Sequence, residues 1–401
     1  MLLQGGVKMS EVTYNFDEPL DRRLPDACKW AVADGELPMW VADMDFRTAS
    51  EVRDAIVARA EHGAFGYSEV TDEWRSSVAD WWQSRHGLEL QPSELVFSTG
   101  VVAALSSAVR ALTNVHENVV VQPPVYNIFW NSVVNNGRHV LESPLVFNGE
   151  RWQVDWADLE EKLADPQTSL MVVCNPHNPT GTIWQAEELA RIGELCERHG
   201  VAVFSDEIHC ELTRPGRGHV PFAAASDLCR KISVTAASPS KAFNLAGMQS
   251  AYIFASDAKL RHRVERQLNT DECAEPNAFA ISSAVAAYTS GAAWLDALRD
   301  YIQQNKDEVA RFVSERIDGV RMCPSDATYL CWLDCRSITL DDRALCDHLR
   351  AKTGLILSTG SQYGEAGKGF LRMNVGTRAE LVRDGLSRLE RGVATFVEPR
   401  E

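Results

Sequence analysis

The chain has 401 residues, which is too long for one ordinary hydrophobic core and predicts either two domains or a large α/β domain with a smaller one attached. Hydrophobic residues make up 45% of the chain and charged residues 24%, a composition typical of globular proteins and not of disordered ones. The formal net charge of −16 repels phosphate backbones and anionic lipids, so nucleic acids and membranes are poor candidates for partners.

The chain start and the cysteines bear on the cellular compartment. The first residues, MLLQGGVKMS, lack the long apolar stretch of a signal peptide, and the sequence leaves open whether Met1 or Met9 is the true start. The ten cysteines form no C-x-x-C pair, and several lie in apolar runs, which indicates buried, reduced thiols. We therefore expect a cytoplasmic protein, and we expect no metal site because the histidines and cysteines show no ligand spacing.

In chain order, the first 50 residues show little periodicity, and we expect them to pack against a smaller C-terminal domain. Apolar residues at helical spacing predict helices over residues 51–62 and 72–86, each followed by a glycine suited to end a helix. The large domain is expected to begin with the first of these helices and to extend over residues 51–287.

From residue 95 onward, short apolar strands alternate with helices. Strands are predicted at residues 95–100, 118–125, 170–176, 201–207, 232–238 and 250–256. Apolar runs separated by helices predict a mostly parallel sheet in an α/β fold.

Beyond residue 288 the pattern changes to that of a smaller α+β domain, which we expect to cover residues 288–401. A long helix is predicted over residues 294–317, and the last helix over residues 378–391. Between them, YLCWLD and FLRMNV are predicted strands.

Polar residues at the strand ends are the candidates for chemistry, because ligands bind at the carboxyl ends of strands in such sheets. The candidates are Gly100, Val101, Val102, Asn178, Asp206, His209, Ser238, Ser240 and Lys241. Each alone has an ordinary explanation as a turn, a helix cap or a surface residue. Together they supply N–H groups at a helix N-terminus for an anion, a lysine after an apolar strand, a carboxylate and an amide.

That combination meets the chemical needs of pyridoxal 5'-phosphate (PLP). The aldehyde of PLP needs a lysine amine, and apolar surroundings favour the neutral, nucleophilic form of Lys241. The pyridine nitrogen needs a buried carboxylate such as Asp206, and the ring hydroxyl needs a donor such as Asn178. Tyr126, in QPPVYNIFW, is a suitable flat partner for the ring face.

Eight ordered blocks of sequence, which together extend over nearly the whole chain, resemble the class I/II aminotransferase group of fold-type-I PLP enzymes. The blocks are LPMWVADMDF (37–46), FGYSE (65–69), GVVAALSSAV (100–109), PPVYNIFW (123–130), CNPHNPTG (174–181), SDEIHCEL (205–212), SPSKAFNLAGMQSAY (238–252) and LRMNVGT (371–377). Within that group, WVADMDF, PHNPTG and DEIH are similar to the cystathionine β-lyase-type carbon–sulfur lyases.

The resemblance implies a role in cofactor binding for each candidate. Lys241 would form the Schiff base, Asp206 would pair with the pyridine nitrogen, and Asn178 would contact the ring hydroxyl. His209 stands where many relatives have a tyrosine, and Tyr126 would stack on the ring. The phosphate would be held by Gly100, Val101, Val102, Ser238 and Ser240. One departure is Gln249, which stands where many aminotransferases have a phosphate-binding arginine, so these donors must compensate for the missing charge.

The resemblance also implies how substrate and subunits are arranged. Arg372 would bind the substrate α-carboxylate as a bidentate pair, assisted by the backbone near Ala42. Tyr67 would reach the cofactor phosphate of a neighbouring subunit, which implies a homodimer with sites at the interface. The catalytic candidates are therefore Lys241, Tyr126 and Tyr67.

The implied activity is a PLP-dependent β-lyase that converts cystathionine or another L-cysteine S-conjugate to pyruvate, ammonia and a thiol. Two alternatives stay open. An aminotransferase on the same scaffold would start from the same Cα carbanion, so sequence separates the two reactions poorly. A regulatory protein that binds a partner, with incidental lyase activity, belongs to another class. The sequence does not name the preferred S-substituent.

Overall fold

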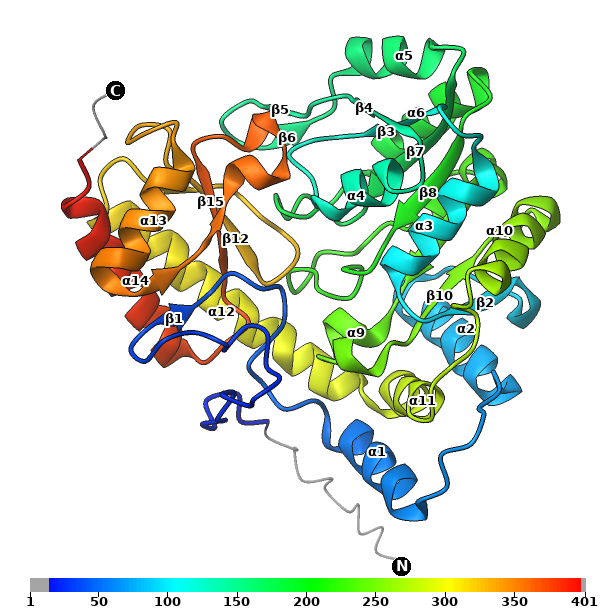
Figure 1. Cartoon of the computed structure of the whole chain (residues 1–401), viewed down its shortest axis with the longest axis horizontal. Helices are drawn as coiled ribbons and strands as arrows, with labels where there is room; N and C mark the ends of the chain where they lie inside the picture. The colour runs from blue at the N-terminus through cyan, green and yellow to red at the C-terminus, as the bar shows by residue number, and fades with distance from the viewer. Residues whose placement is uncertain (1–13, 398–401) are drawn as a thin grey trace, which may run out of the picture.

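A seven-stranded sheet lies at the centre of the computed structural model, which describes residues 14–397; Met1 and Met9 lie outside that range (Figure 1). In spatial order its strands are β2 (Leu95–Ser98), β10 (Ala251–Phe254), β9 (Ser233–Ala237), β8 (Ala202–Asp206), β7 (Thr168–Cys174), β3 (Asn118–Val121) and β4 (His139–Glu142). From β9 to β4 the neighbours are parallel, whereas β10 is antiparallel to both β2 and β9. The predicted mostly parallel sheet is confirmed.

Helices cover both faces of this sheet, which explains why its strands are apolar without alternation. Neighbouring residues of β7 show the arrangement, because Val172 and Val173 belong to separate core clusters on opposite faces. One face packs against α3 (Val101–Leu112), α4 (Ile128–Val134) and α10 (Ala258–Thr270). The other packs against α5 (Trp156–Ala164), α6 (Ala186–Arg198), α7 (Phe222–Ala225) and α8 (Asp227–Ile232).

The C-terminal part is built on an antiparallel sheet beside the long helix α12 (Ala292–Arg316), at the left of Figure 1. This four-stranded sheet has the order β11 (Arg321–Met322), β12 (Leu330–Asp334), β15 (Phe370–Asn374) and β14 (Ser358–Thr359). The helices α13 (Asp342–Thr353) and α14 (Ala379–Ala394) pack on one another beside it. The long helix and the last helix therefore form where the sequence places them.

The N-terminal residues contact both parts of the molecule. The strand β1 (Leu37–Pro38) pairs in parallel with β13 (Leu355–Ile356) of the C-terminal part. Phe16, Met44 and Phe46 instead enter a core cluster with helices of the large part. Among residues 14–397, no helix is long and apolar enough to cross a membrane.

The remaining elements are short or peripheral. They are α1 (Ser50–His62), α2 (Asp72–His86), α9 (Pro239–Ala242), α11 (Ala280–Ser290), β5 (Val146–Phe147), β6 (Trp152–Gln153) and the 3₁₀ turns η1 (Pro92–Glu94), η2 (Ala246–Met248), η3 (Gly360–Tyr363) and η4 (Glu365–Gly367). The helices α1 and α2 form as predicted, and left-handed Gly63 and Gly87 end them.

Candidate active site

A cavity of about 210 Å³ opens where β7, β8 and β9 end and where α3 begins. Every residue that sequence reasoning placed in the site lines this cavity, except Tyr67 and Arg372. The structure adds wall residues that the sequence did not single out: Thr99, Cys174, Ile208, Ala246 and Ser250. The topology thus brings together strand ends that lie far apart in the chain, as expected for this class of sheet.

Lys241 lies on the short helix α9, which follows β9 directly. Ser238 caps this helix by accepting a hydrogen bond from the Ser240 N–H at 3.0 Å. The Lys241 ammonium donates a hydrogen bond to the carbonyl of Ala42 at 2.6 Å. Burial lowers the pKa of Lys241 to about 8, and the positive charge of Arg372 acts in the same direction. The neutral amine therefore becomes the main form above about pH 8, well below the pH at which an exposed lysine loses its proton.

The carboxylate of Asp206, at the end of β8, is buried without an ion-pair partner. Its side chain accepts a hydrogen bond from the Ile208 N–H at 3.1 Å and forms no ion pair with any residue between 14 and 397. Burial raises the pKa of Asp206 to about 7, and the neighbouring Glu207 adds to the rise. A buried carboxylate that lacks a cation fits the protonated pyridine nitrogen of PLP, which would supply one.

The N-terminus of α3 forms the anion-binding end of the cavity. Val101 and Val102 lie in the first turn, where N–H groups have no partner within the helix. A Cβ placed on Gly100 would meet no atom within 4 Å, so the space in front of this turn is open. Gln249 lines the same cavity in a left-handed conformation with φ of 49°, so this position contributes a neutral amide and not a positive charge.

The hydroxyl of Ser238 is already engaged. It donates to the carbonyl of Ser250 at 2.6 Å while it accepts from Ser240. The hydroxyls of Thr99 and Ser240 form no hydrogen bond with the part of the chain that the structure describes. They are therefore better placed than Ser238 to serve as phosphate donors.

Arg372, on β15, reaches the site from the C-terminal part. Its guanidinium donates to Asn178 Oδ1 at 3.2 Å and to the carbonyl of Trp40 at 2.8 Å, and it lies 4.9 Å from the centre of the Tyr363 ring. Its Nε has no hydrogen-bond partner among the described residues although it is buried. Both existing acceptors are neutral, so a carboxylate would be a stronger partner for this fork.

Two tyrosines and a histidine complete the surroundings. Burial raises the pKa of Tyr126, and the Asp206 carboxylate adds to the rise, so the phenol stays protonated. Burial lowers the pKa of His209 to about 3, so this imidazole is neutral. Tyr329 donates to Ala42, the same carbonyl that Lys241 uses, at 2.9 Å. The sequence did not single out Tyr329, which directly precedes β12. A tyrosine next to an apolar strand is equally typical of the hydrophobic core.

Tyr67 lies apart from this cavity. Its side chain is fully exposed, and Phe65 beside it is also exposed. Within one chain, the structure does not bring Tyr67 to the site.

A single group of potential metal ligands occurs within residues 14–397: His86, Cys210 and Glu211, whose ligand atoms lie within 4.8 Å of one another. Glu211 already accepts hydrogen bonds from Trp81 Nε1 at 2.6 Å and from His86 Nε2 at 2.7 Å. Arg85 lies 3.8 Å from the same carboxylate. The acid is therefore neutralised by protein groups, and a cation would have to displace them.

Comparisons with known proteins agree with this geometry. A family model described as aminotransferase class I and II matches residues 39–389. Cystathionine beta-lyase PatB of Bacillus subtilis is 43% identical over 383 residues, covering 94% of this chain and 99% of that protein. Cystalysin from Treponema denticola, whose crystal structure contains PLP, matches with a TM-score of 0.92 and 26% identity over 95% of this chain and 99% of that one.

A PLP-bound C-S lyase from Staphylococcus hominis matches with a TM-score of 0.88 and 30% identity, over 96% of this chain and 99% of that one. These matches confirm the fold type and the group that the eight sequence blocks resemble. The chain belongs to the aminotransferase class I and II family.

Proposed function

We propose that this protein is a PLP-dependent carbon–sulfur β-lyase that converts cystathionine or other L-cysteine S-conjugates to pyruvate, ammonia and a thiol. The observation that carries the proposal is one cavity that joins Lys241, with its lowered pKa, to the unpaired carboxylate of Asp206. The names of the relatives, cystathionine beta-lyase and C-S lyase, support this activity over the others that the scaffold allows.

The cavity offers a partner for each part of the cofactor. Lys241 would bind the aldehyde carbon, Asp206 the pyridine nitrogen and Asn178 the ring hydroxyl, with His209 nearby and the Tyr126 ring against the cofactor ring. The phosphate would meet the N–H groups after Gly100, with Ser240, Thr99 and Gln249 as neutral donors. When bound, PLP supplies an electron sink for the carbanion formed at the substrate Cα.

Residues of the chain would bind the substrate and transfer its protons. Arg372 would bind the substrate carboxylate, exchanging its two neutral acceptors for a charged one. The neutral Lys241 amine would accept the Cα proton and return a proton to the departing thiolate. The burial of this pocket would keep water away and strengthen the electrostatic interactions within it.

We infer a cytoplasmic homodimer with three structural units: residues 1–50, 51–287 and 288–401. The full exposure of Tyr67, next to exposed Phe65, supports a contact surface that a second subunit would cover. All ten cysteines are free, which supports a reducing compartment. Sedimentation equilibrium should give a mass near twice the 44.5 kDa of one chain.

The experiment that tests the activity is a product assay on cystathionine and on S-alkyl cysteines without any keto acid. A β-lyase releases pyruvate, ammonia and thiol over many turnovers, because loss of the thiolate needs no second substrate. A single stoichiometric reaction that only an added keto acid restores would show an aminotransferase instead. Bound cofactor without turnover on any amino acid would favour the regulatory alternative.

A further inference from the structure

A segment without regular secondary structure, residues 40–46, runs between the two parts of the molecule; we call it the strap. Its main-chain carbonyls accept hydrogen bonds from side chains of both parts. Trp40 accepts from Arg372 at 2.8 Å, and Ala42 accepts from Lys241 at 2.6 Å. Two residues that the proposed reaction depends on are therefore held by the same short stretch of backbone.

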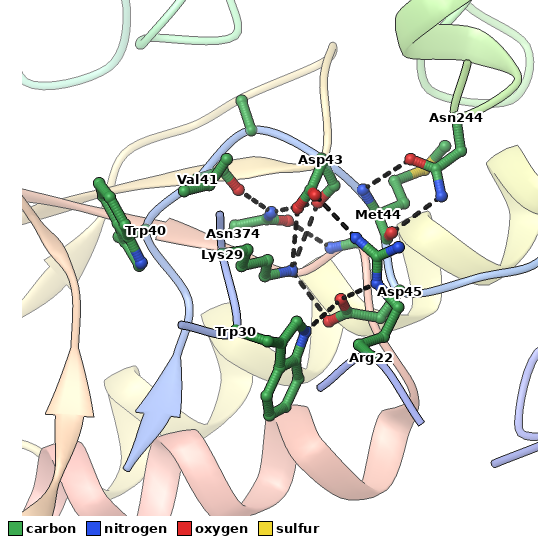
Figure 2. A network of polar contacts seen from close by, with 12 residues as sticks. Arg22, Lys29, Trp30, Trp40, Val41, Asp43, Met44, Asp45, Asn244 and Asn374 are labelled. Atoms are coloured by element: carbon green, nitrogen blue, oxygen red, sulfur yellow. Dashed lines mark hydrogen bonds and ion pairs between the residues drawn. The ribbon is translucent and has the colours of Figure 1, made fainter. Parts of the chain in front are cut away.

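Two asparagines connect the strap to the elements that carry these residues. Asn374, on the same strand as Arg372, donates to the carbonyls of Val41 and Asp43. Asn244, shortly after Lys241, accepts from the Met44 N–H at 3.2 Å and donates to the Met44 carbonyl at 2.9 Å. Figure 2 shows both asparagines reaching the strap from opposite sides.

A charge cluster, in which Lys29 and Asp45 are buried and Arg22 and Asp43 are partly exposed, joins the strap to residues that precede it in the chain (Figure 2). The Lys29 side chain is 1% exposed, and its ammonium lies 2.9 Å from Asp45 and 3.6 Å from Asp43. Arg22 pairs with the same two acids, at 2.8 Å from Asp43 and 3.4 Å from Asp45. Trp30 Nε1 also donates to Asp45 at 2.8 Å. Two cations thus balance two carboxylates, and both carboxylates belong to the strap.

Each ion of the cluster has two partners of opposite charge, so removing one member leaves one charge in excess. The strap would have to move to hydrate that charge. Asp43 directly follows Ala42, so any such movement displaces the carbonyl that holds the Lys241 amine. Residues 40–46 belong to no helix or strand, and within residues 14–397 one main-chain hydrogen bond holds them, from the Asp45 N–H to the carbonyl of Gly376 at 2.8 Å. The other hydrogen bonds and ion pairs of the strap described above are made by side chains.

We propose that Lys29 and Asp45 are positioning residues for the reaction, which act through the strap to place Lys241 and Arg372. The proposal rests on the proposed function for the roles of those two residues. It assigns to the N-terminal residues a part in catalysis although Lys29 and Asp45 do not line the cavity.

The test compares Asp45→Asn with Glu211→Gln. The two acids are matched: each is buried, and each accepts from a tryptophan indole, pairs with a buried base and has an arginine nearby. Glu211 contacts neither the strap nor the wall of the cavity. Both substitutions keep the shape of the side chain and remove its charge.

Two measurements are made on folded protein. The first is the rate at which PLP attaches to Lys241 in the apoprotein, trapped by borohydride, and the second is kcat/KM of enzyme with full cofactor occupancy. We expect Asp45→Asn to slow attachment and to lower kcat/KM, each by about 10- to 100-fold, the cost of a misplacement near 1 Å. Glu211→Gln should lower the melting temperature and leave both rates within about twofold of the wild type, since its hydrogen bonds and ion pairs involve neither the strap nor the residues that line the cavity.

Charge variants of Lys29 sharpen the result. Lys29→Arg keeps the charge, so its rate of PLP attachment and its kcat/KM should stay close to those of the wild type, whereas Lys29→Met should lower both. Lys29→Met combined with Asp45→Asn should be less impaired than Lys29→Met alone, because the double change leaves one fewer unpaired charge.

Equal effects of Asp45→Asn and Glu211→Gln on stability, with unchanged attachment and kcat/KM in both, would overturn the proposal. If Asp45→Asn does not fold, Lys29→Met supplies the same comparison with Glu211→Gln, and wild-type rates with a normal pH profile in Lys29→Met would overturn the proposal as well. A wild-type enzyme that cleaves no S-conjugate would contradict the proposed function alone, since the attachment rate would still report on the strap.

Discussion

Asp206, the last residue of β8, and Glu211, five residues later, are both buried acids, but their surroundings are opposite. Asp206 forms no ion pair with any residue between 14 and 397; burial raises its pKa to about 7, although the charge of Lys241 acts in the opposite direction. Glu211 has His86, Trp81 and Arg85 as partners, which together outweigh burial and lower its pKa to about 2. Burial of an acid therefore does not mark a site by itself, whereas a buried acid without an ion pair is a candidate for binding a cationic group.

The same contrast holds for two buried lysines. Burial lowers the pKa of both Lys241 and Lys306 to about 8. Lys306 donates to Ser325 Oγ and to the carbonyls of Ala327 and Thr328, so its hydrogen bonds are satisfied within the fold. Lys241 has one acceptor and faces the cavity. A lowered pKa is therefore shared by a structural lysine and by the proposed catalytic one.

The largest expected effect is that of Lys241→Ala. Loss of the amine removes both the covalent attachment point and the base, so activity should fall by at least about 1000-fold. Borohydride reduction of the wild type, followed by peptide mass spectrometry, should place the cofactor on the peptide that contains Lys241.

Lys306→Met is the matched control for that experiment. It should lower stability, because three acceptors lose their donor, and it should keep the covalent cofactor. Attachment of the cofactor at Lys306, or at any lysine other than Lys241, would contradict the contrast between the two lysines.

Asp206→Asn is expected to lower kcat/KM by about 100- to 1000-fold, because the pyridinium loses the charge that stabilises it. The apoprotein should respond in the other direction. The raised pKa of Asp206 means that ionising it costs stability, a cost that grows as pH rises and is complete above pH 7. The asparagine variant should therefore melt higher than wild-type apoprotein at pH 8, with a smaller difference at pH 5.

In contrast to Asp206→Asn, which should stabilise the apoprotein, Glu211→Gln should lower the melting temperature of both apoprotein and holoprotein. Breaking a buried ion pair costs about 3–5 kcal/mol, while cofactor affinity should be unchanged. Calorimetry on both variants, with and without PLP, measures these shifts. A destabilised Asp206→Asn apoprotein at pH 8 would show that this acid has a structural partner after all.

Arg372→Ala should reduce kcat/KM by about 30- to 1000-fold, corresponding to loss of a bidentate carboxylate contact. Cofactor affinity should change far less, because Arg372 does not line the cavity. Steady-state kinetics and a PLP titration of the apoprotein separate the two. An unchanged kcat/KM would mean that Arg372 has only a structural role, through its hydrogen bonds to Asn178 and Trp40.

The smallest expected effect is a pH shift. With a folded pKa of about 8, the neutral Lys241 amine dominates above pH 8, so PLP attachment to the apoprotein should reach half its maximal rate near that pH. The charge of Arg372 helps to lower this pKa, so Arg372→Ala should move the midpoint to higher pH. A midpoint that stays at the same pH would show that burial alone sets it.

The sequence by itself determined the alternation of strands and helices in the large part, the long helix α12 and most of the residues that line the cavity. These follow from local rules: apolar periodicity forms the elements, and parallel strands gather the polar residues at their carboxyl ends. The eight ordered blocks also carried the family, which the comparisons then confirmed.

Only the tertiary structure decided how the surrounding groups divide between site and scaffold. Position at the end of a strand singled out Asp206 and Lys241, but no local pattern shows which buried charges are paired, because their partners come from distant parts of the chain. Packing between the two parts also sets two further contacts. One is the hydrogen bond from Tyr329 to the carbonyl of Ala42, and the other is the ion pair of Lys29 with Asp45. Whether a charged side chain is buried and paired depends on which residues lie near it in three dimensions, and local sequence patterns do not contain that information.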